Sequence, residues 1–312
     1  MPNRPPHFRH RAIGGFSLAC ALAAFALAPA ATSAETAARI AFTVQDATLD
    51  EISGLAVSAR HRNALWVLED SGKAAALTAI GKRGERIATY TIEGETNVDW
   101  EDLSSFVVDG KPHLLIADVG DNDAIREQVR LIAVAEPSSL RDGTLRPVWS
   151  IEFAWPGGAR DCEAIAVDSR RGEILLISKR HRPPELFVLS LNAEEGAPRT
   201  ARRLASLAGI RVLDDATVRA NPKAIYRHQV TGASLTPDGR RLAVLTYSNI
   251  LLYERRRNEG WAEAIARKPR TLALPPLRQA EAIAWTRNAQ ALLVTSEDAP
   301  APVYRVAVPA PK

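Results

Sequence analysis

The sequence has 312 residues, of which 46% are hydrophobic and 24% are charged. This composition is typical of a globular domain and excludes a disordered, collagen-like or disulfide-framework protein. The formal net charge is +4. Three of the 40 basic residues, Arg4, Arg9 and Arg11, lie in an N-terminal stretch that has no acidic residue. The rest of the chain contains 37 basic and 36 acidic residues and is therefore almost neutral. So balanced a charge argues against nucleic-acid binding, and we expect no nucleic-acid partner.

The first 34 residues have the order of a secretory signal peptide. Residues 1–11 are polar and basic, residues 12–31 form an Ala-rich apolar run, and small residues follow at 32–34. Glycines and a proline interrupt the run and no stop-transfer flank follows, so we expect no stable membrane span after the signal is removed. A lipoprotein is the alternative, because the leader contains a cysteine, Cys20. We therefore predict a signal peptide over 1–34 and a mature protein, 35–312, that is periplasmic or secreted.

From about residue 40 onward the chain consists of short β-strand patterns separated by turns. Five segments share one start: a polar or acidic residue, a small residue or Asp, alternating apolar residues, a turn and a second, more apolar strand. Such units predict the four-stranded antiparallel blades of an all-β protein, a β-propeller. The aligned polar residues, spaced 48, 62, 68 and 50 positions apart, are Ser53, Glu101, Glu163, Thr231 and Glu281.

A propeller has to close its ring, and the two ends of the mature chain offer a way to do so. The last unit has only three strand patterns, ending at 303–308, whereas a spare strand at 39–44 precedes the first unit. Pairing them would complete the last blade and cover two sheet edges. Five blades are favoured within the single domain 35–312. Six stay open, because residues 206–229 could hold a degenerate unit or a long functional loop, and a two-sheet sandwich is the alternative fold.

The blade pattern predicts where the polar residues meet. In a propeller all first strands start on the same face, and the antiparallel second strands return to it. The aligned residues should therefore share one rim with the residues that follow the second strands. These followers include Asp70, Asp118, Lys179, His181, Tyr247 and Glu297.

This acidic rim has three interpretations. Oxygen ligands gathered at a channel mouth suit a divalent cation such as Ca²⁺, which Glu101, Asp118, Glu163 and Glu281 would bind. Carboxylates near His181 and Lys179 could instead perform general acid–base or metal-assisted catalysis. In the third, structural interpretation, the carboxylates accept backbone N–H bonds where the first strands begin. Three buried glutamates in a narrow channel need a cation or basic groups, which keeps the metal interpretation open.

The residues of this rim also carry a resemblance. The chain resembles secreted bacterial β-propeller proteins related to the SdiA-regulated and phytase-like propellers. The resemblance implies a propeller over nearly the whole mature chain and an esterase-like or phytase-like activity, with Lys179, Arg180 and Arg126 as the corresponding phosphate-binding cations. The matching strings are residues 51–55, 99–103, 118–122, 136–137, 161–164, 230–233, 237–239, 246–247 and 279–282.

Two functional hypotheses follow. In the first, a secreted or periplasmic monomer binds Ca²⁺ at its acidic rim and a small ligand or an envelope protein on the same face. In the alternative, the protein is a metal-dependent hydrolase, a phytase-like phosphoesterase, esterase or lactonase. The four carboxylates would then hold the metal, and His181 or Lys179 would handle protons or substrate charge.

Overall fold

The computed structural model describes residues 1, 38–191 and 199–310. The chain divides into two units, 1–35 and 36–312, and the second contains all the strands and helices of the described residues. The predicted signal peptide lies outside the described residues, apart from Met1. Among the described helices, none is both long enough and apolar enough to cross a membrane.

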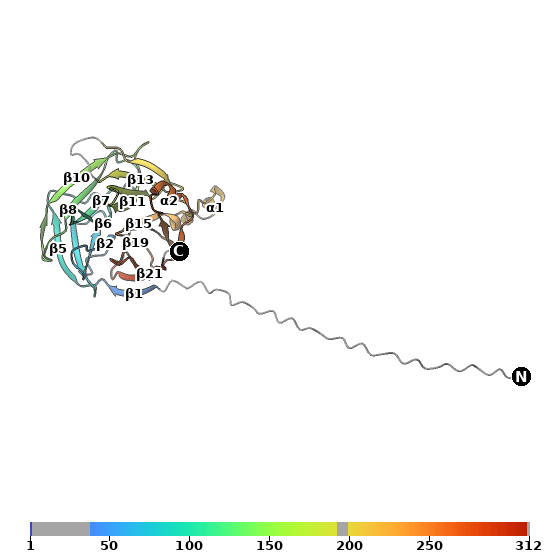
Figure 1. Cartoon of the computed structure of the whole chain (residues 1–312), viewed down its shortest axis with the longest axis horizontal. Coiled ribbons are helices and arrows are strands. Elements are labelled where there is room, and N and C mark those ends of the chain that lie inside the picture. The colour runs from blue at the N-terminus through green and yellow to red at the C-terminus, as the bar shows by residue number, and fades with distance from the viewer. Residues whose placement is uncertain (2–37, 192–198, 311–312) are drawn as a thin grey trace. The chain divides into compact units, whose positions relative to one another are not determined.

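The strands form five sheets around a common centre (Figure 1), and each sheet is one blade of a propeller. Within each blade the neighbouring strands are antiparallel. Blade 1 contains β2 (Ile52–Val57), β3 (Ala64–Glu69), β4 (Ala76–Gly81) and β5 (Arg86–Ile92), with the short β9 (Gly143–Leu145) added in parallel. Blade 2 contains β6 (Trp100–Val108), β7 (Lys111–Asp118), β8 (Val129–Ala135) and β10 (Pro147–Phe153).

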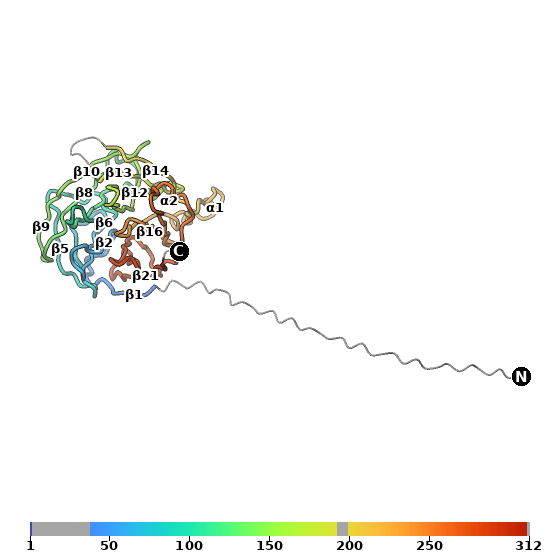
Figure 2. The backbone as a smooth tube through the Cα atoms, viewed as in Figure 1, coloured from blue at the N-terminus to red at the C-terminus, as the bar shows by residue number. Residues whose placement is uncertain are grey.

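The remaining blades continue around the ring, as the backbone trace in Figure 2 shows. Blade 3 contains β11 (Cys162–Asp168), β12 (Glu173–Ser178), β13 (Glu185–Ser190) and β14 (Arg202–Ser206). Blade 4 contains β15 (Val230–Leu235), β16 (Arg241–Thr246), β17 (Asn249–Glu254) and β18 (Arg270–Ala273). Blade 5 contains β19 (Ala280–Trp285), β20 (Ala291–Ser296), β21 (Pro302–Ala307) and β1 (Ala38–Thr43).

The ring closes as the sequence predicts. Strand β1 pairs antiparallel with β21, so the first described strand of the chain completes the last blade. The five-blade count is confirmed, because the segment that might have held a sixth blade contains no strand between β14 and β15. It holds two short helices, α1 (Asp215–Ala220) and the 3₁₀-helix η1 (Pro222–His228). The third helix, α2 (Trp261–Ala266), connects β17 to β18.

The core of the propeller is divided among the blade interfaces. Five clusters of buried hydrophobic side chains occur, one between each pair of neighbouring blades. Leu115 of blade 2 and Leu176 of blade 3, for example, are both fully buried in one of these clusters. Burying a side chain of this size stabilises a fold by about 1.5–3 kcal/mol. The five interfaces therefore fix the inner strands β2, β6, β11, β15 and β19 side by side around the axis.

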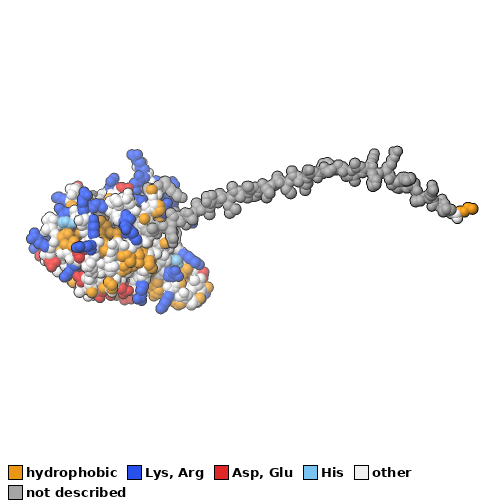
Figure 3. Space-filling model, turned by 90° about the horizontal axis from the view of Figure 1, so that it is seen from below, with side chains coloured by type: hydrophobic (Ala, Val, Ile, Leu, Met, Phe, Trp, Pro, Cys, Tyr) orange, Lys and Arg blue, Asp and Glu red, His pale blue; other side chains and the backbone are white. Residues whose placement is uncertain are grey.

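The side of the propeller seen in Figure 3 is chemically mixed. Basic, hydrophobic and uncharged polar side chains are interspersed over it, with a few acidic ones. No region of a single charge sign covers this side, in agreement with the balanced composition.

Candidate functional site

Each inner strand carries a β-bulge at the same place. The register between the first and second strands of every blade shifts across one residue near the start of the inner strand. Bulges re-aim the side chain of the extra residue. The five skipped residues are the polar residues that the sequence repeat aligned, namely Ser53, Glu101, Glu163, Thr231 and Glu281. We call the end of the channel where these residues lie the acidic mouth.

Two of the five bulge residues join neighbouring blades. The hydroxyl of Ser53 donates a hydrogen bond of 2.9 Å to the backbone carbonyl of Trp100 in blade 2. In the same way, Thr231 donates a bond of 2.6 Å to the carbonyl of Ala280 in blade 5. Both hydroxyls are buried, so each bond satisfies polar groups that water does not reach. At these two positions the bulge residue has a structural role.

The three glutamates at the equivalent positions make no bond to the backbone of the described chain. Glu163 pairs with the ammonium group of Lys179, and Glu281 accepts a hydrogen bond from the hydroxyl of Tyr247. Glu101 is only 6% exposed, and its carboxylate has no hydrogen-bond or ion-pair partner among the described residues. A buried carboxylate without a partner is costly, so Glu101 has the property expected of a ligand for a cation.

Two aspartates of the rim, Asp118 and Asp161, do accept backbone N–H bonds, as the structural interpretation predicts. Asp118 accepts from the backbone N–H of Asp99 at 3.2 Å and pairs with Arg126 at 2.9 Å. Asp161 accepts from the backbone N–H of Asp121 at 3.2 Å and from Arg180 at 2.6 Å. Asp118, which the sequence suggested as a metal ligand, is therefore already satisfied by protein groups.

Glu101 belongs to two groups of carboxylates that could hold a metal ion. One group contains Asp70, Asp99 and Glu101, and the other contains Glu101, Asp161 and Glu163. Within each group, one oxygen from every residue lies within 4.8 Å of the others. Ca²⁺ binds oxygen at about 2.3–2.6 Å, so two of its ligands can be up to about 5 Å apart. The spacing of both groups therefore fits one cation, with Glu101 as the shared ligand.

The electrostatics of the mouth also favour a cation. Burial, together with the neighbouring acidic groups, raises the pKa of Asp99 to about 6 and that of Glu297 to about 7. Burial raises the pKa of Glu281 to about 8 against the opposing effect of Lys179. The pKa of Glu101 is raised by burial and by the charges of Glu163 and Asp70. The charge of Lys179 opposes these shifts for Glu101 and Glu281 without cancelling them, and protons or a metal ion would neutralise the remaining charge.

Lys179 and Tyr247 are two neighbouring hydrogen-bond donors inside the acidic mouth. The ammonium nitrogen of Lys179 lies 3.4 Å from the Tyr247 hydroxyl and pairs with Glu163. Burial disfavours the charged ammonium, but the charges of Glu163 and Glu281 outweigh this effect and raise the pKa of Lys179. Burial and the charge of Glu281 likewise raise the pKa of Tyr247. Both groups stay protonated at neutral pH, so they donate hydrogen bonds and do not act as bases.

The structure brings most of the predicted site residues together. Glu101, Glu163, Glu281 and Lys179 all lie at the acidic mouth, and Asp118 lies beside it. His181 contacts other groups: its side chain is 44% exposed, and its ring lies against Arg160 and 3.8 Å from Glu185. Burial and the charge of Arg160 lower the pKa of His181.

Asp102 closes the channel directly behind the mouth. Its carboxylate is fully buried and accepts backbone N–H bonds from Leu103 at 2.7 Å, Ile165 at 2.8 Å and Ala233 at 3.2 Å. Three blades are thus tied together near the axis by one side chain. The other four inner strands have only Gly or Ala at this position, which leaves room for the carboxylate; they are Gly54, Ala164, Gly232 and Ala282.

Comparisons with known proteins find distant structural likenesses. No protein-family model matches the sequence, and no curated protein matches it. The chain is similar to one in the crystal structure of a nidogen/laminin complex, at 12% identity and a TM-score of 0.45, over 78% of this chain and 72% of that one. It is also similar to Chaetomium thermophilum Raptor, at 13% identity and a TM-score of 0.42, over 82% of this chain and 20% of that one. These values carry no argument about function, and the propeller assignment rests on the strands described above.

Proposed function

We propose that the protein is a periplasmic or secreted binding propeller that holds one divalent cation, Ca²⁺, at its acidic mouth. The observation that carries the proposal is the carboxylate of Glu101, which is buried, has no hydrogen-bond or ion-pair partner among the described residues and is shared by two groups with metal-ligand spacing. Oxygen-only ligands of this kind suit Ca²⁺ better than the transition metals that prefer nitrogen or sulfur. A small ligand or an envelope protein would then bind on the same face.

The proposed cation would do two things. It would neutralise carboxylates that otherwise have to share protons, and it would cross-link blades 2 and 3 through Glu101 and Glu163 or Asp161. A ligand that binds only the folded state stabilises it by RT ln(1 + L/Kd), where L is the free ligand concentration, a gain that grows with the logarithm of that concentration above the dissociation constant. Calcium should therefore raise the melting temperature, and a chelator should lower it.

The experiment is a calorimetric titration of the chelator-treated protein with CaCl₂. We expect one site per chain, with a dissociation constant of about 10⁻³ M or tighter. Glu101→Gln keeps the shape of the side chain and removes its charge, so it should abolish this binding. Glu152→Gln is the matched control, because the Glu152 side chain is 62% exposed on blade 2 and, within the described part of the chain, forms an ion pair with Arg130 alone, at 3.8 Å. No heat of binding, or equal binding by Glu101→Gln, would contradict the proposal.

Asp118→Asn separates the metal role from the structural role. Because Asp118 already accepts from Asp99 and pairs with Arg126, its loss should lower stability while leaving Ca²⁺ affinity within about threefold. A loss of affinity as large as that of Glu101→Gln would place Asp118 among the ligands, as the sequence suggested.

A metal-dependent hydrolase is the second candidate, and one observation favours it. Three cations, Lys179, Arg180 and Arg126, border the carboxylates and could hold an anionic substrate such as a phosphate ester. In this function Lys179 would bind substrate charge, and it would not take a proton. The test is turnover of phosphate-ester, carboxyl-ester and lactone substrates with Ca²⁺ and with a chelator. Calcium binding without turnover of any of them would exclude this candidate for those substrates.

A further inference from the structure

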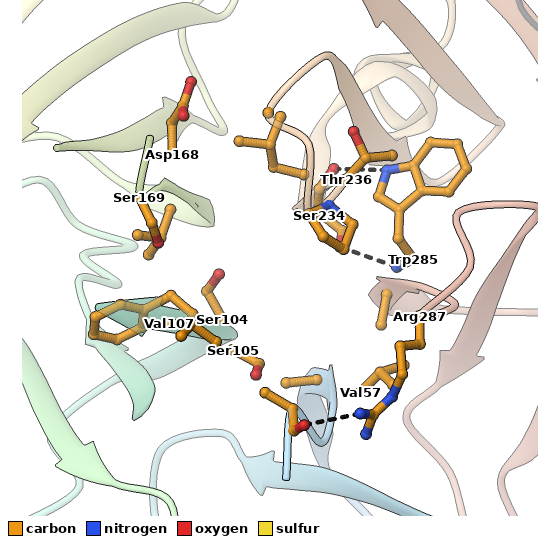
Figure 4. A pocket seen from close by; sticks show the side chains of 18 of the residues that line it. Val57, Ser104, Ser105, Val107, Asp168, Ser169, Ser234, Thr236, Trp285 and Arg287 are labelled. Atoms are coloured by element: carbon orange, nitrogen blue, oxygen red, sulfur yellow. Dashed lines mark hydrogen bonds between the residues drawn. The ribbon is translucent and has the colours of Figure 1, made fainter. Parts of the chain in front are cut away.

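The channel has a second opening, at the end opposite the acidic mouth. All five inner strands end around a cavity of 510 Å³ (Figure 4). Its lining includes Val57 of blade 1, Ser105 of blade 2, Asp168 of blade 3, Ser234 of blade 4 and Trp285 of blade 5. We call this space the lower cavity. Asp102, which ties three blades together at the axis, lies between it and the acidic mouth.

The lower cavity exists because the inner strands repeat a small residue. Three positions after the bulge, every inner strand has Ala or Ser, and no side chain there is large enough to fill the axis. The strand ends are held apart by the blade interfaces, so the space cannot collapse. The five small residues are Ala56, Ser104, Ala166, Ser234 and Ala284, and all of them except Ala166 line the cavity.

Three hydroxyl groups of the lower cavity are available to a ligand. Ser104, Ser105 and Ser169 make no side-chain hydrogen bond with any described residue, and Figure 4 shows them around the open centre of the cavity. Each serine hydroxyl can donate one hydrogen bond and accept others. Hydroxyls grouped in this way suit a ligand that itself carries several hydroxyl groups.

Arginines outnumber carboxylates in the lining of the lower cavity, in contrast to the acidic mouth. Arg170 and Arg287 line it, and neither forms an ion pair with a described residue. Arg287 is held in place by bonds to the backbone carbonyls of Ser58 and Ala59, the latter at 2.9 Å. The only carboxylate of the lining is that of Asp168, which points away from the centre in Figure 4.

The carboxylate of Asp168 is also engaged by neighbouring groups. One of its oxygens accepts a bond of 3.1 Å from the indole N–H of Trp261 and lies 3.7 Å from the guanidinium of Arg255, whereas the other oxygen is buried and has no hydrogen-bond partner among the described residues. With two arginines against this one carboxylate, the lining of the lower cavity has a net positive charge. An anion would gain from both arginines, since neither has to leave a carboxylate partner.

We propose that the lower cavity is a second binding site, for a small anion with several hydroxyl groups, of the class of sugar acids. The cavity accommodates a molecule of monosaccharide size: the serines would bind its hydroxyls, and Arg287 and Arg170 would bind its carboxylate. This site shares no residue with the acidic mouth, and the proposal does not rest on the proposed cation. The same chain would then carry two chemically opposite sites on one axis.

The test is a calorimetric titration of the purified protein with glucuronate in the presence of EDTA. The chelator removes any Ca²⁺ that could bridge a carboxylate to the acidic mouth. We expect a dissociation constant on the order of 1 mM or tighter for a ligand of this size. Glucose, which lacks the charge, and propionate, which lacks the hydroxyls, should each bind at least about tenfold more weakly.

Three variants locate the binding. Ser105→Leu fills the cavity and should abolish glucuronate binding. Arg170→Gln leaves the fold intact, because the Arg170 side chain is exposed and makes only one weak bond, of 3.4 Å to Pro237, and it should weaken binding about tenfold. Arg219→Gln, an exposed arginine of α1, is the matched control and should change nothing.

The outcomes separate this proposal from the cation proposal. Glu101→Gln should bind glucuronate as the unaltered protein does, and Arg170→Gln should bind Ca²⁺ as the unaltered protein does. Absence of glucuronate binding, equal binding of glucose, or binding that survives both Ser105→Leu and Arg170→Gln would overturn the assignment of the lower cavity.

Discussion

Gly120 lies directly against the carboxylate of Glu101. A β-carbon built on Gly120 would come within 2.2 Å of the Glu101 Oε1 and 2.4 Å of an oxygen of Asp99. Both contacts are far shorter than any that real atoms make, so only glycine leaves these two carboxylates where they are. The loop after β7 thus shapes the candidate metal site without contributing a side chain to it.

Gly120→Ala should therefore impair Ca²⁺ binding. The added methyl group displaces Glu101 and Asp99, two carboxylates of the same proposed group, and we expect the Ca²⁺ affinity to fall at least about tenfold. Calorimetric titration measures this change, and circular dichroism of the metal-free variant checks its fold. Gly94→Ala is the control: this glycine has positive φ but open space around it, so its strain should cost stability and not affinity. An unchanged affinity in Gly120→Ala would contradict the assigned ligands.

Thr231→Val tests the structural role of the hydroxyl bulge residues. It removes the hydroxyl that binds the carbonyl of Ala280 and leaves that buried carbonyl without its partner. We expect a loss of about 1–3 kcal/mol in the free energy of unfolding, with Ca²⁺ affinity unchanged. Urea denaturation provides the measurement. A large loss of affinity with little loss of stability would show that Thr231 belongs to the metal site instead.

Asp102→Asn tests the tie at the centre of the channel. The amide keeps the size of the carboxylate but has one acceptor oxygen in place of two, so it cannot satisfy all three backbone N–H groups. A loss of about 2 kcal/mol or more in unfolding free energy is expected. Asp109→Asn, at an exposed hairpin turn, should be close to neutral by the same denaturation assay. Equal stability of the two variants would argue against the tie.

The metal-free protein should lose stability as the pH rises. Asp99, Glu297 and Glu281 have pKa values raised to about 6, 7 and 8, so the folded state holds their protons more tightly than the unfolded state does. The stabilisation from these protons is complete below the unfolded values, near pH 4, and disappears as the pH passes through 6 to 8. Melting curves in EDTA from pH 5 to 9 measure it. Saturating Ca²⁺ should restore most of the loss, whereas stability that rises over this range would contradict the account.

The repeat in the sequence predicted much of this architecture, because every blade is built from the same strand pattern with the same polar start. The five aligned polar residues proved to be the five bulge residues, and the spare N-terminal strand closes the ring. The partners of individual carboxylates were not predictable. Asp118 and Glu101 look alike in the sequence, yet only the structure shows that Arg126 pairs with Asp118 while Glu101 has no hydrogen-bond or ion-pair partner among the described residues. The resemblance to phytase-like propellers stays a prediction.

The lower cavity was not predicted from the sequence, although the sequence contains a pattern of small residues that indicates it. Small residues recur three positions after each bulge, as Ser104 and Ala284 illustrate. A small residue in one strand does not predict a cavity, because the cavity forms only where five such strands meet at an axis. The arginines of its rim come from loops of different blades, and their convergence depends on the closed ring. Positions such as Arg287 are therefore visible as site residues only in the structure.

The most direct test of the central claim is a crystal structure of the protein grown with CaCl₂. We expect one strong electron-density peak at the acidic mouth, about 2.3–2.6 Å from a carboxylate oxygen of Glu101 and from oxygens of Asp99 and Asp70 or of Asp161 and Glu163. An acidic mouth that contains only water at saturating calcium, with the Glu101 carboxylate bound to a protein group, would contradict it.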